Sequence, residues 1–244
     1  MMKRLLLTMG LVLLLSSSEQ ALAVEEWPGQ ETDVFAADVG LDPGHSRVDV
    51  GAAGGGLREY QLTLSTAERV KQLLEEEGLT VALSRQDDLP LTALSDPDPT
   101  ERTRLEQEAR IAAVGRTRVY VSLHFNGLGD PRVRGAECYY NAGNHGEESR
   151  LLAQAIEDGL VGEVTVAGYD LPDRGVKEDL WAGKPYGHFF SLRGAAPSVL
   201  VESMFLTNPH EAFLLSNEDI REAVARGIAR GIAGYLQPYA NPLP

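Results

Sequence analysis

Residues 118–125 read RVYVSLHF, an apolar run of the length of a buried strand that closes on a histidine and a phenylalanine. Similar short runs recur along the chain and alternate with longer segments that have apolar residues at helical spacing. The other strand-like runs are ADVGLD (37–42), TVALSR (80–85), GAECYYN (135–141) and PSVLVES (197–203), and the helical segments are 60–77, 100–114, 147–160 and 216–236. This alternation predicts an α/β fold in which helices flank both faces of a mostly parallel, twisted sheet.

The last helical segment has the most regular pattern. Its apolar residues recur every fourth position, at Ile220, Val224, Ile228, Ile232 and Leu236. Ser216 and Asp219 are start signals, and Pro238 follows the last apolar residue as a stop signal. The pattern predicts a helix that packs on the core and ends before Pro238.

The first residues have the pattern of a secretory signal peptide. Lys3 and Arg4 precede an apolar run from Leu5 to Leu15, and an Ala-Leu-Ala sequence follows at 21–23. We expect cleavage after residue 23, because the apolar run is too short to span a bilayer, which needs roughly 20 residues. The predicted organisation is a signal peptide (1–23), a linker (24–36), one catalytic domain (37–238) and a C-terminal tail (239–244). We expect an exported monomer with no membrane anchor, located in the periplasm or outside the cell, including the cell wall.

Charge and cysteine content exclude some classes of partner and crosslink. The formal net charge is −14, so nucleic acid and anionic lipid are poor partners for this surface. The single cysteine, Cys138, has no partner for an internal disulfide and lies in the run GAECYY. We expect it to be a small buried apolar residue.

Four polar residues follow or end the predicted strands. His45 comes after ADVGLD and a Pro-Gly turn, His124 ends RVYVSLH, and Glu202 ends PSVLVE. Glu59 begins the first helix, after a glycine-rich loop that can fold back on His45. The carboxyl ends of parallel strands form one edge of a sheet, where functional residues collect.

Two imidazoles and one carboxylate are ligands that suit Zn²⁺, which in catalytic sites keeps a fourth position open. The remaining carboxylate can act as general base for the attacking water. On spacing alone, Asp49, four residues after His45, competes with Glu59 as the third ligand.

In the order and spacing of its motifs, the chain resembles the zinc-dependent N-acetylmuramoyl-L-alanine amidases, the cell-wall hydrolases with a DPGH motif. The motifs are LDPGHSRVDVGAAG with Glu59, VYVSLHFN, GAECYY, RGVK and PSVLVESMFLTN. The resemblance implies a six-stranded sheet, one zinc ion, and hydrolysis of the amide between N-acetylmuramic acid and L-alanine in peptidoglycan. It implies that His45, Glu59 and His124 bind the metal and that Glu202 is the catalytic base.

The chain departs from the family pattern at three places. Ser203 and Met204 stand between Glu202 and Phe205, Phe125-Asn126-Gly127 follows the second histidine, and Arg110 is shifted relative to the family's arginine. None of these departures removes a ligand or the base.

Two other functions stay open at this point. One is a peptidoglycan-binding or regulatory protein that kept the fold without turnover, and the other is a zinc hydrolase of a different bond in the wall peptide. Arg174, Lys177 and Asn126 are candidates to contact stem-peptide carboxylates, with plain solvation of these cations as the alternative.

Overall fold

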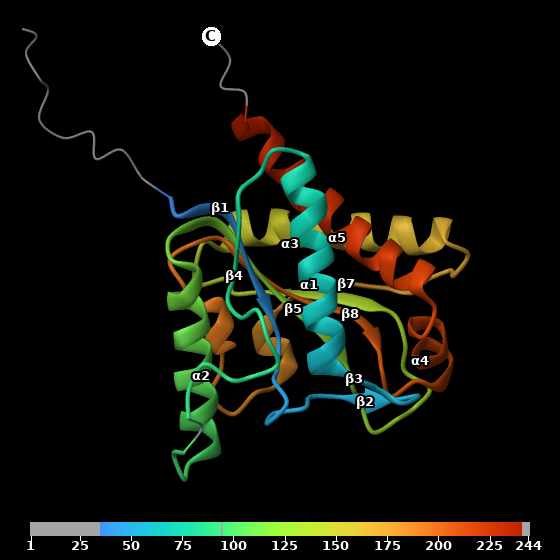
Figure 1. The fold of residues 1–244 in the computed structure, drawn as a ribbon, viewed down its shortest axis with the longest axis horizontal. Helices are drawn as coiled ribbons and strands as arrows, with labels where there is room; N and C mark the ends of the chain where they lie inside the picture. The colour runs from blue at the N-terminus through green and yellow to red at the C-terminus, as the bar shows by residue number, and fades with distance from the viewer. Residues whose placement is uncertain (1–34, 94, 241–244) are drawn as a thin grey trace, which may run out of the picture. The chain divides into compact units, whose positions relative to one another are not determined.

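The computed structural model describes residues 35–93 and 95–240, which build a six-stranded sheet between helices (Figure 1). The predicted signal peptide, most of the predicted linker and most of the predicted tail lie outside these residues. The strand order is β4-β1-β5-β8-β6-β7. The bounds are β1 Ala37–Pro43, β4 Val81–Leu83, β5 Thr117–Asn126, β6 Ala136–Tyr140, β7 Asp173–Glu178 and β8 Ser198–Phe205.

The sheet is parallel except at one pair of strands. β4, β1, β5 and β8 run in the same direction, whereas β6 pairs with β8 antiparallel and with β7 parallel. The predicted fold class is therefore confirmed. The four parallel strands bring their carboxyl ends to one edge, where the two predicted histidines lie.

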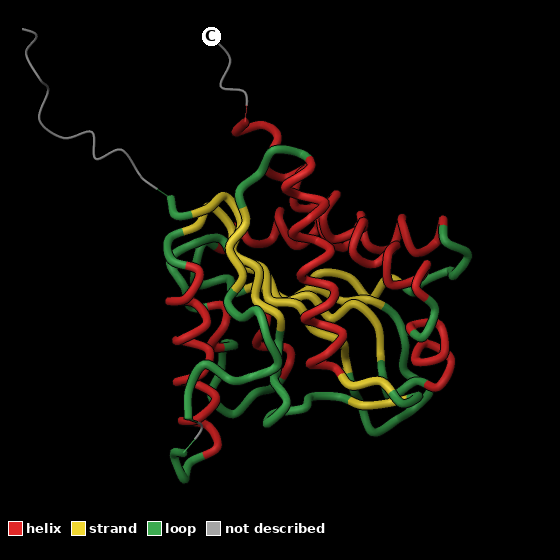
Figure 2. The backbone as a smooth tube through the Cα atoms, viewed as in Figure 1, coloured by secondary structure: helices red, strands yellow, loops and turns green. Residues whose placement is uncertain are grey.

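Helices cover both faces of the sheet (Figure 2). On one face lie α1 (Glu59–Glu76), α3 (Gly146–Val166) and α5 (Glu218–Ala240), and on the other lie α2 (Pro99–Val114) and the short helix η2 (Phe190–Leu192). The alternation of β5 matches this layering. Val119, Val121 and Leu123 belong to the large core beneath α1, α3 and α5, whereas Tyr120 packs against α2.

Several bounds differ from the sequence prediction. α3 extends to Val166, and α5 continues through Pro238 to Ala240, beyond the predicted end. A proline so close to a helix end removes one N–H and disturbs the last turn only. The strand β7, the short helix α4 (Pro209–Leu215) and the hairpin of β2 (Ala53–Gly54) and β3 (Leu57–Arg58) were not predicted by the pattern. Among the described residues, no helix is both long and apolar enough to cross a bilayer.

Candidate active site

The side chains of His45, Glu59 and His124 meet at the carboxyl edge of the sheet. One ligand atom from each lies within 4.8 Å of the others. Glu59 Oε1 lies 3.2 Å from His45 Nε2 and 2.9 Å from His124 Nδ1. The two imidazole rings are nearly perpendicular, with centroids 4.9 Å apart. Residues from β5, the turn after β1 and the start of α1 thus present two nitrogens and one oxygen to a common point.

This arrangement fits a divalent metal ion. Ligands that bind zinc at about 2.0–2.1 Å in a tetrahedron lie roughly 3.3 Å from one another. The Glu59–His45 and Glu59–His124 separations of 3.2 and 2.9 Å are close to that value, and all three ligand atoms lie within 4.8 Å of one another. The chemistry and the close approach of these three side chains suggest a metal site.

Asp49 lies on the outer side of His45. Its Oδ2 is 3.0 Å from His45 Nδ1, the ring nitrogen that faces away from Glu59. A carboxylate on the distal nitrogen of a ligand histidine fixes the tautomer and the orientation of the ring. The geometry thus separates the two carboxylates that spacing alone left in competition. Burial disfavours the imidazolium, but hydrogen bonds with Asp49 and Glu59 outweigh it and raise the pKa of His45 to about 10.

Backbone amides hold the Glu59 carboxylate in place. The hairpin β2–β3 returns the chain after the glycine-rich loop, so that Glu59 begins α1 beside the turn that contains His45. Ala52 N donates to Glu59 Oε2 at 2.6 Å, and Phe125 N donates to Oε1 at 3.1 Å. Burial would raise the pKa of Glu59, but its hydrogen bonds and the nearby imidazoles hold it far below the usual range. The carboxylate is therefore kept ionised, as a metal ligand must be.

Two buried arginines hold the turn that presents His45. Arg85 Nη2 donates to the Gly44 carbonyl at 3.0 Å, and Arg110 Nη2 donates to the His45 carbonyl at 2.6 Å. Arg110 also pairs with Asp42, at 3.1 Å. Burial would raise the pKa of the Asp42 carboxyl, but Arg110 and two serine hydroxyls keep it below the usual range. The sequence marked Arg110 only as a shifted family residue, and nothing in its spacing indicated this role.

Glu202 lies next to His124 across the sheet. The two residues are direct partners in the β5–β8 register, so their side chains lie on the same face. Removal from water, and then the charge of Glu59, raise the pKa of Glu202 well above its ordinary value. Its Oε2 is buried and has no hydrogen-bond partner among the described residues. A carboxyl whose pKa is raised is a stronger base than an ordinary glutamate, which suits a group that takes up a proton and passes it on.

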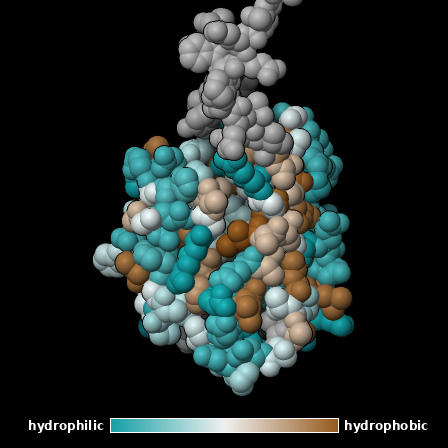
Figure 3. Space-filling model, turned by 90° about the vertical axis from the view of Figure 1, so that its left-hand side faces the viewer, coloured by the Kyte–Doolittle hydropathy of each residue, from teal (hydrophilic) through white to brown (hydrophobic). Residues whose placement is uncertain are grey.

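A cleft opens over these residues. It has a volume of about 170 Å³, and its lining includes His45, His124 and Glu202 together with Tyr186, Phe189 and Phe190. A second cleft of about 510 Å³ runs along α2. The two clefts share lining residues and therefore adjoin each other. Figure 3, which looks onto the side where α2 lies in Figure 1, shows hydrophobic residues gathered among hydrophilic ones on that side of the molecule. The aromatic side chains give this cleft a partly apolar lining beside His45 and His124.

The residues after Glu202 do not line this cleft. Ser203 is 1% exposed, and Met204, fully buried, belongs to the large core. The departure from the family pattern at these positions therefore changes core packing rather than the lining of the cleft.

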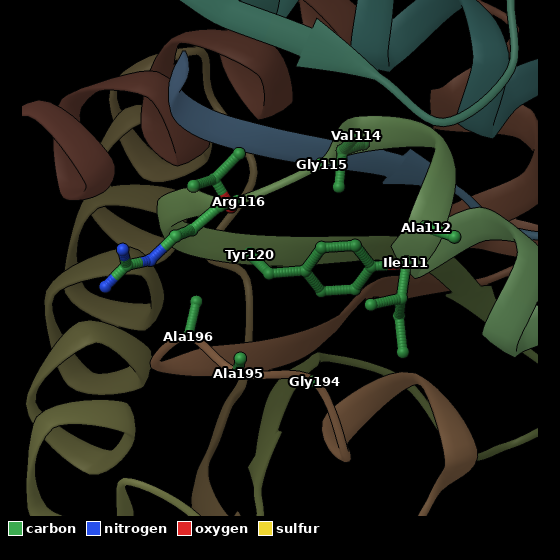
Figure 4. Close-up of a pocket in the computed structure, with 10 residues that line it drawn as sticks. Ile111, Ala112, Val114, Gly115, Arg116, Tyr120, Gly194, Ala195 and Ala196 are labelled. Carbon is green, nitrogen blue, oxygen red and sulfur yellow. The ribbon is translucent and has the colours of Figure 1, made fainter. Parts of the chain in front are cut away.

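An apolar cavity of about 320 Å³ lies elsewhere, between the end of α2 and the segment before β8 (Figure 4). Tyr120 and Ile111 face it from one side, and Ala195 and Ala196 from the other. Tyr120 precedes His124 by four residues on β5, which is about 13 Å along an extended strand. This cavity is therefore separate from the metal ligands.

Comparison with known proteins agrees with the geometry. The sequence profile of a family described as N-acetylmuramoyl-L-alanine amidase matches residues 39–234. The chain belongs to this family. It is 34% identical to an uncharacterized protein, YqiI, of Bacillus subtilis over 76% of this chain and 78% of that protein. It is 28% identical to the germination-specific N-acetylmuramoyl-L-alanine amidase of the same organism, over 89% of this chain and 87% of the relative.

A solved structure confirms the fold of the family. The catalytic domain of the amidase CwlV from Bacillus (Paenibacillus) polymyxa var. colistinus superposes with a TM-score of 0.62 at 29% identity, covering 82% of this chain and 97% of that domain. The chain is thus an N-acetylmuramoyl-L-alanine amidase, a hydrolase of a family that acts on peptidoglycan outside the cytoplasm. Its His-Glu-His cluster is a metal site consistent with a zinc amidase.

Proposed function

We propose that the metal is zinc and that Glu202 is the catalytic base in hydrolysis of the amide between N-acetylmuramic acid and L-alanine. The observation that supports this most directly is the convergence of His45, Glu59 and His124 within 4.8 Å, with Glu202 beside His124 in the sheet. We further propose that the protein is exported through its signal peptide, since its substrate lies outside the membrane, and that it acts as a monomer.

Three side chains hold the metal, and a fourth moves the proton. Zinc bound by His45, Glu59 and His124 would supply Lewis-acid chemistry to the scissile carbonyl and to water. Glu202 accepts the proton of the attacking water and then donates it to the nitrogen of L-alanine as the amide breaks. The products are a free lactyl carboxyl on the sugar and a stem peptide with a free amino terminus.

Asp49 and the backbone supply orientation rather than chemistry. Asp49 holds the outer nitrogen of His45, and the amides of Ala52 and Phe125 hold both oxygens of Glu59. Because these contacts already hold the ligand side chains, the side chains lose little conformational freedom when the metal binds.

The test is mass spectrometry of purified peptidoglycan after incubation with the mature protein, with chelator and with zinc added back. Free stem peptides that begin with L-alanine, lost on chelation and restored by zinc, are the expected result. Glu202→Gln should keep stoichiometric zinc and lose on the order of 10³-fold in rate. Intact glycan-linked peptides after incubation with the zinc-loaded protein would contradict the proposal and favour a binding role, and cleavage elsewhere in the peptide would favour a different hydrolase.

A further inference from the structure

The sheet carries a second charged cluster beyond Glu202, on β6 and β7. Glu137 is the direct partner of Glu202 in the β6–β8 register, and its side chain is only 4% exposed. One of its oxygens accepts hydrogen bonds from two neutral groups, and the other accepts from two cations. The donors are Asn126 Nδ2 at 2.7 Å and Tyr139 Oη at 2.9 Å to Oε1, and Arg174 Nε at 2.7 Å and Lys177 Nζ to Oε2.

A bulge in β7 brings both cations to the same carboxylate. Residues three apart in a regular strand point to opposite faces, so Arg174 and Lys177 should diverge. However, Ala136 pairs with Asp173 and Cys138 pairs with Val176, so two steps along β6 face three along β7. Gly175, between them, has φ 80°, a conformation that glycine adopts without strain. The extra residue turns Arg174 toward the face that Lys177 already occupies.

The two cations of this cluster carry more positive charge than is required to neutralise the Glu137 carboxylate. One carboxylate faces two cations, in a chain whose net charge is −14. The side chains of Arg174 and Lys177 are 31% and 28% exposed, so solvent or a ligand can reach both. Each gives Glu137 one donor, although a guanidinium has five N–H groups and an ammonium three. Among the described residues, these are the hydrogen bonds that the two cations make.

Ring contacts limit how far the two cations can move. The Arg174 guanidinium lies 5.1 Å from the centre of the Phe205 ring, and the Lys177 ammonium lies 5.8 Å from that of Tyr139. Held over aromatic faces and tied to a buried carboxylate, they form a preorganised receptor for an anion.

We propose that Arg174 and Lys177 bind a free carboxylate of the stem peptide, within the first three residues after the scissile amide. Neighbouring strands lie about 4.8 Å apart, so β7 is roughly 10 Å from Glu202 on β8. An extended peptide covers about 3.3–3.6 Å per residue, and three residues therefore span this distance. This inference rests on the proposed amidase reaction, because it assigns the leaving peptide to the β6–β7 side of Glu202.

The test compares two synthetic muramoyl tripeptides that differ only in whether the carboxyl groups of the peptide are free or are carboxamides. The zinc-loaded wild-type protein should favour the carboxylate form at least tenfold in kcat/KM. In Arg174→Gln this ratio should fall toward one, mainly through a higher KM for the carboxylate form, and Arg174→Lys should retain part of the preference. Arg132→Gln is the matched control, since Arg132 is exposed and paired with Asp130 in a loop, and it should keep the full ratio.

Equal hydrolysis of the two substrates by the wild-type protein, or an undiminished ratio in Arg174→Gln, would overturn the inference while leaving the amidase reaction intact. If neither substrate were cleaved, the amidase proposal would fail by itself. Calorimetric binding of both tripeptides to Glu202→Gln then still decides the question. Tighter binding of the carboxylate form that Arg174→Gln abolishes supports the site, and equal binding refutes it.

Discussion

Replacing Gly44 by alanine should displace a metal ligand without altering any ligand. A Cβ at this position would lie 2.3 Å from His124 Cε1, 2.5 Å from Nε2 and 2.7 Å from Nδ1. Nonbonded carbon atoms approach to about 3.5 Å, so the ring or the turn must shift by about 1 Å. The substitution therefore tests whether the turn after β1 and the second histidine are packed together to form the site.

Neither neighbour can move at low cost. The Gly44 carbonyl accepts hydrogen bonds from Thr63 Oγ1 at 2.7 Å and from Arg85 Nη2 at 3.0 Å, which hold the turn. His124 is 8% exposed, and its Nδ1 lies 2.9 Å from Glu59. Ligand distances in metal sites hold to about ±0.2 Å, so a shift of about 1 Å removes a working ligand. We expect zinc affinity to fall at least about 100-fold, which is roughly 2.7 kcal/mol.

The assay is a competition titration of the apoprotein with zinc and a chromophoric chelator, followed by hydrolysis measured in excess zinc. Gly129→Ala is the matched control, because Gly129 has open space around its Cβ position. The control should bind zinc as the wild-type protein does. Wild-type affinity in Gly44→Ala, in a protein with an unchanged circular dichroism spectrum, would refute the argument that these contacts position the ligand.

Three further outcomes follow from the contacts described above. Asp49→Ala should weaken zinc binding by about 10- to 100-fold in the same titration, because His45 loses the carboxylate on its outer nitrogen. Arg110→Leu should lower the free energy of unfolding by about 3–5 kcal/mol in a urea titration, since it leaves the buried Asp42 without its cation. Burial raises the pKa of Glu157 on α3 to about 8 from an ordinary 4.5, so the folded state keeps a proton that the unfolded state releases, and stability falls as pH rises between these values. Glu157→Gln should thus be more stable than wild type by about 3 kcal/mol at pH 7 and equal to it below pH 4, and a constant difference across this range would contradict the assignment.

The sequence was sufficient for the residues whose pattern is local. RVYVSLHF and PSVLVES are apolar runs that carry a polar residue, His124 or Glu202, next to their last position, and each became a central strand with that residue at the site. The edge strand β7 gave no such signal. Its sequence, DRGVKE, is mostly half-buried, lacks alternation and contains the bulge at Gly175, so neither hydrophobicity nor period distinguished it from a loop.

Residue spacing alone could not assign the two carboxylates near His45, although the family resemblance implied that Glu59 is the ligand. Asp49 follows His45 by four residues, whereas Glu59 is much farther along the chain, so spacing favoured neither. The β2–β3 hairpin brings Glu59 to the inner nitrogen of His45, and the turn leaves Asp49 at the outer one. Which ring nitrogen faces which carboxylate depends on a side-chain torsion, and periodicity carries no information about that.

The backbone conformation of His45 is strained, and two buried arginines hold it in place. His45 has φ 63°, a left-handed conformation that costs a non-glycine residue about 1–2 kcal/mol and persists only when its surroundings hold it. Arg110 binds the carbonyl of His45, Arg85 binds that of Gly44, and Asp49 binds the ring. From a sequence alone, such arginines are expected at the surface, because arginine is seldom fully buried unless it is paired. The strained conformation of His45 and the two buried cations are therefore parts of one arrangement. The arginines hold the backbone of the turn, and one imidazole nitrogen of His45 is directed toward Glu59 before any metal binds.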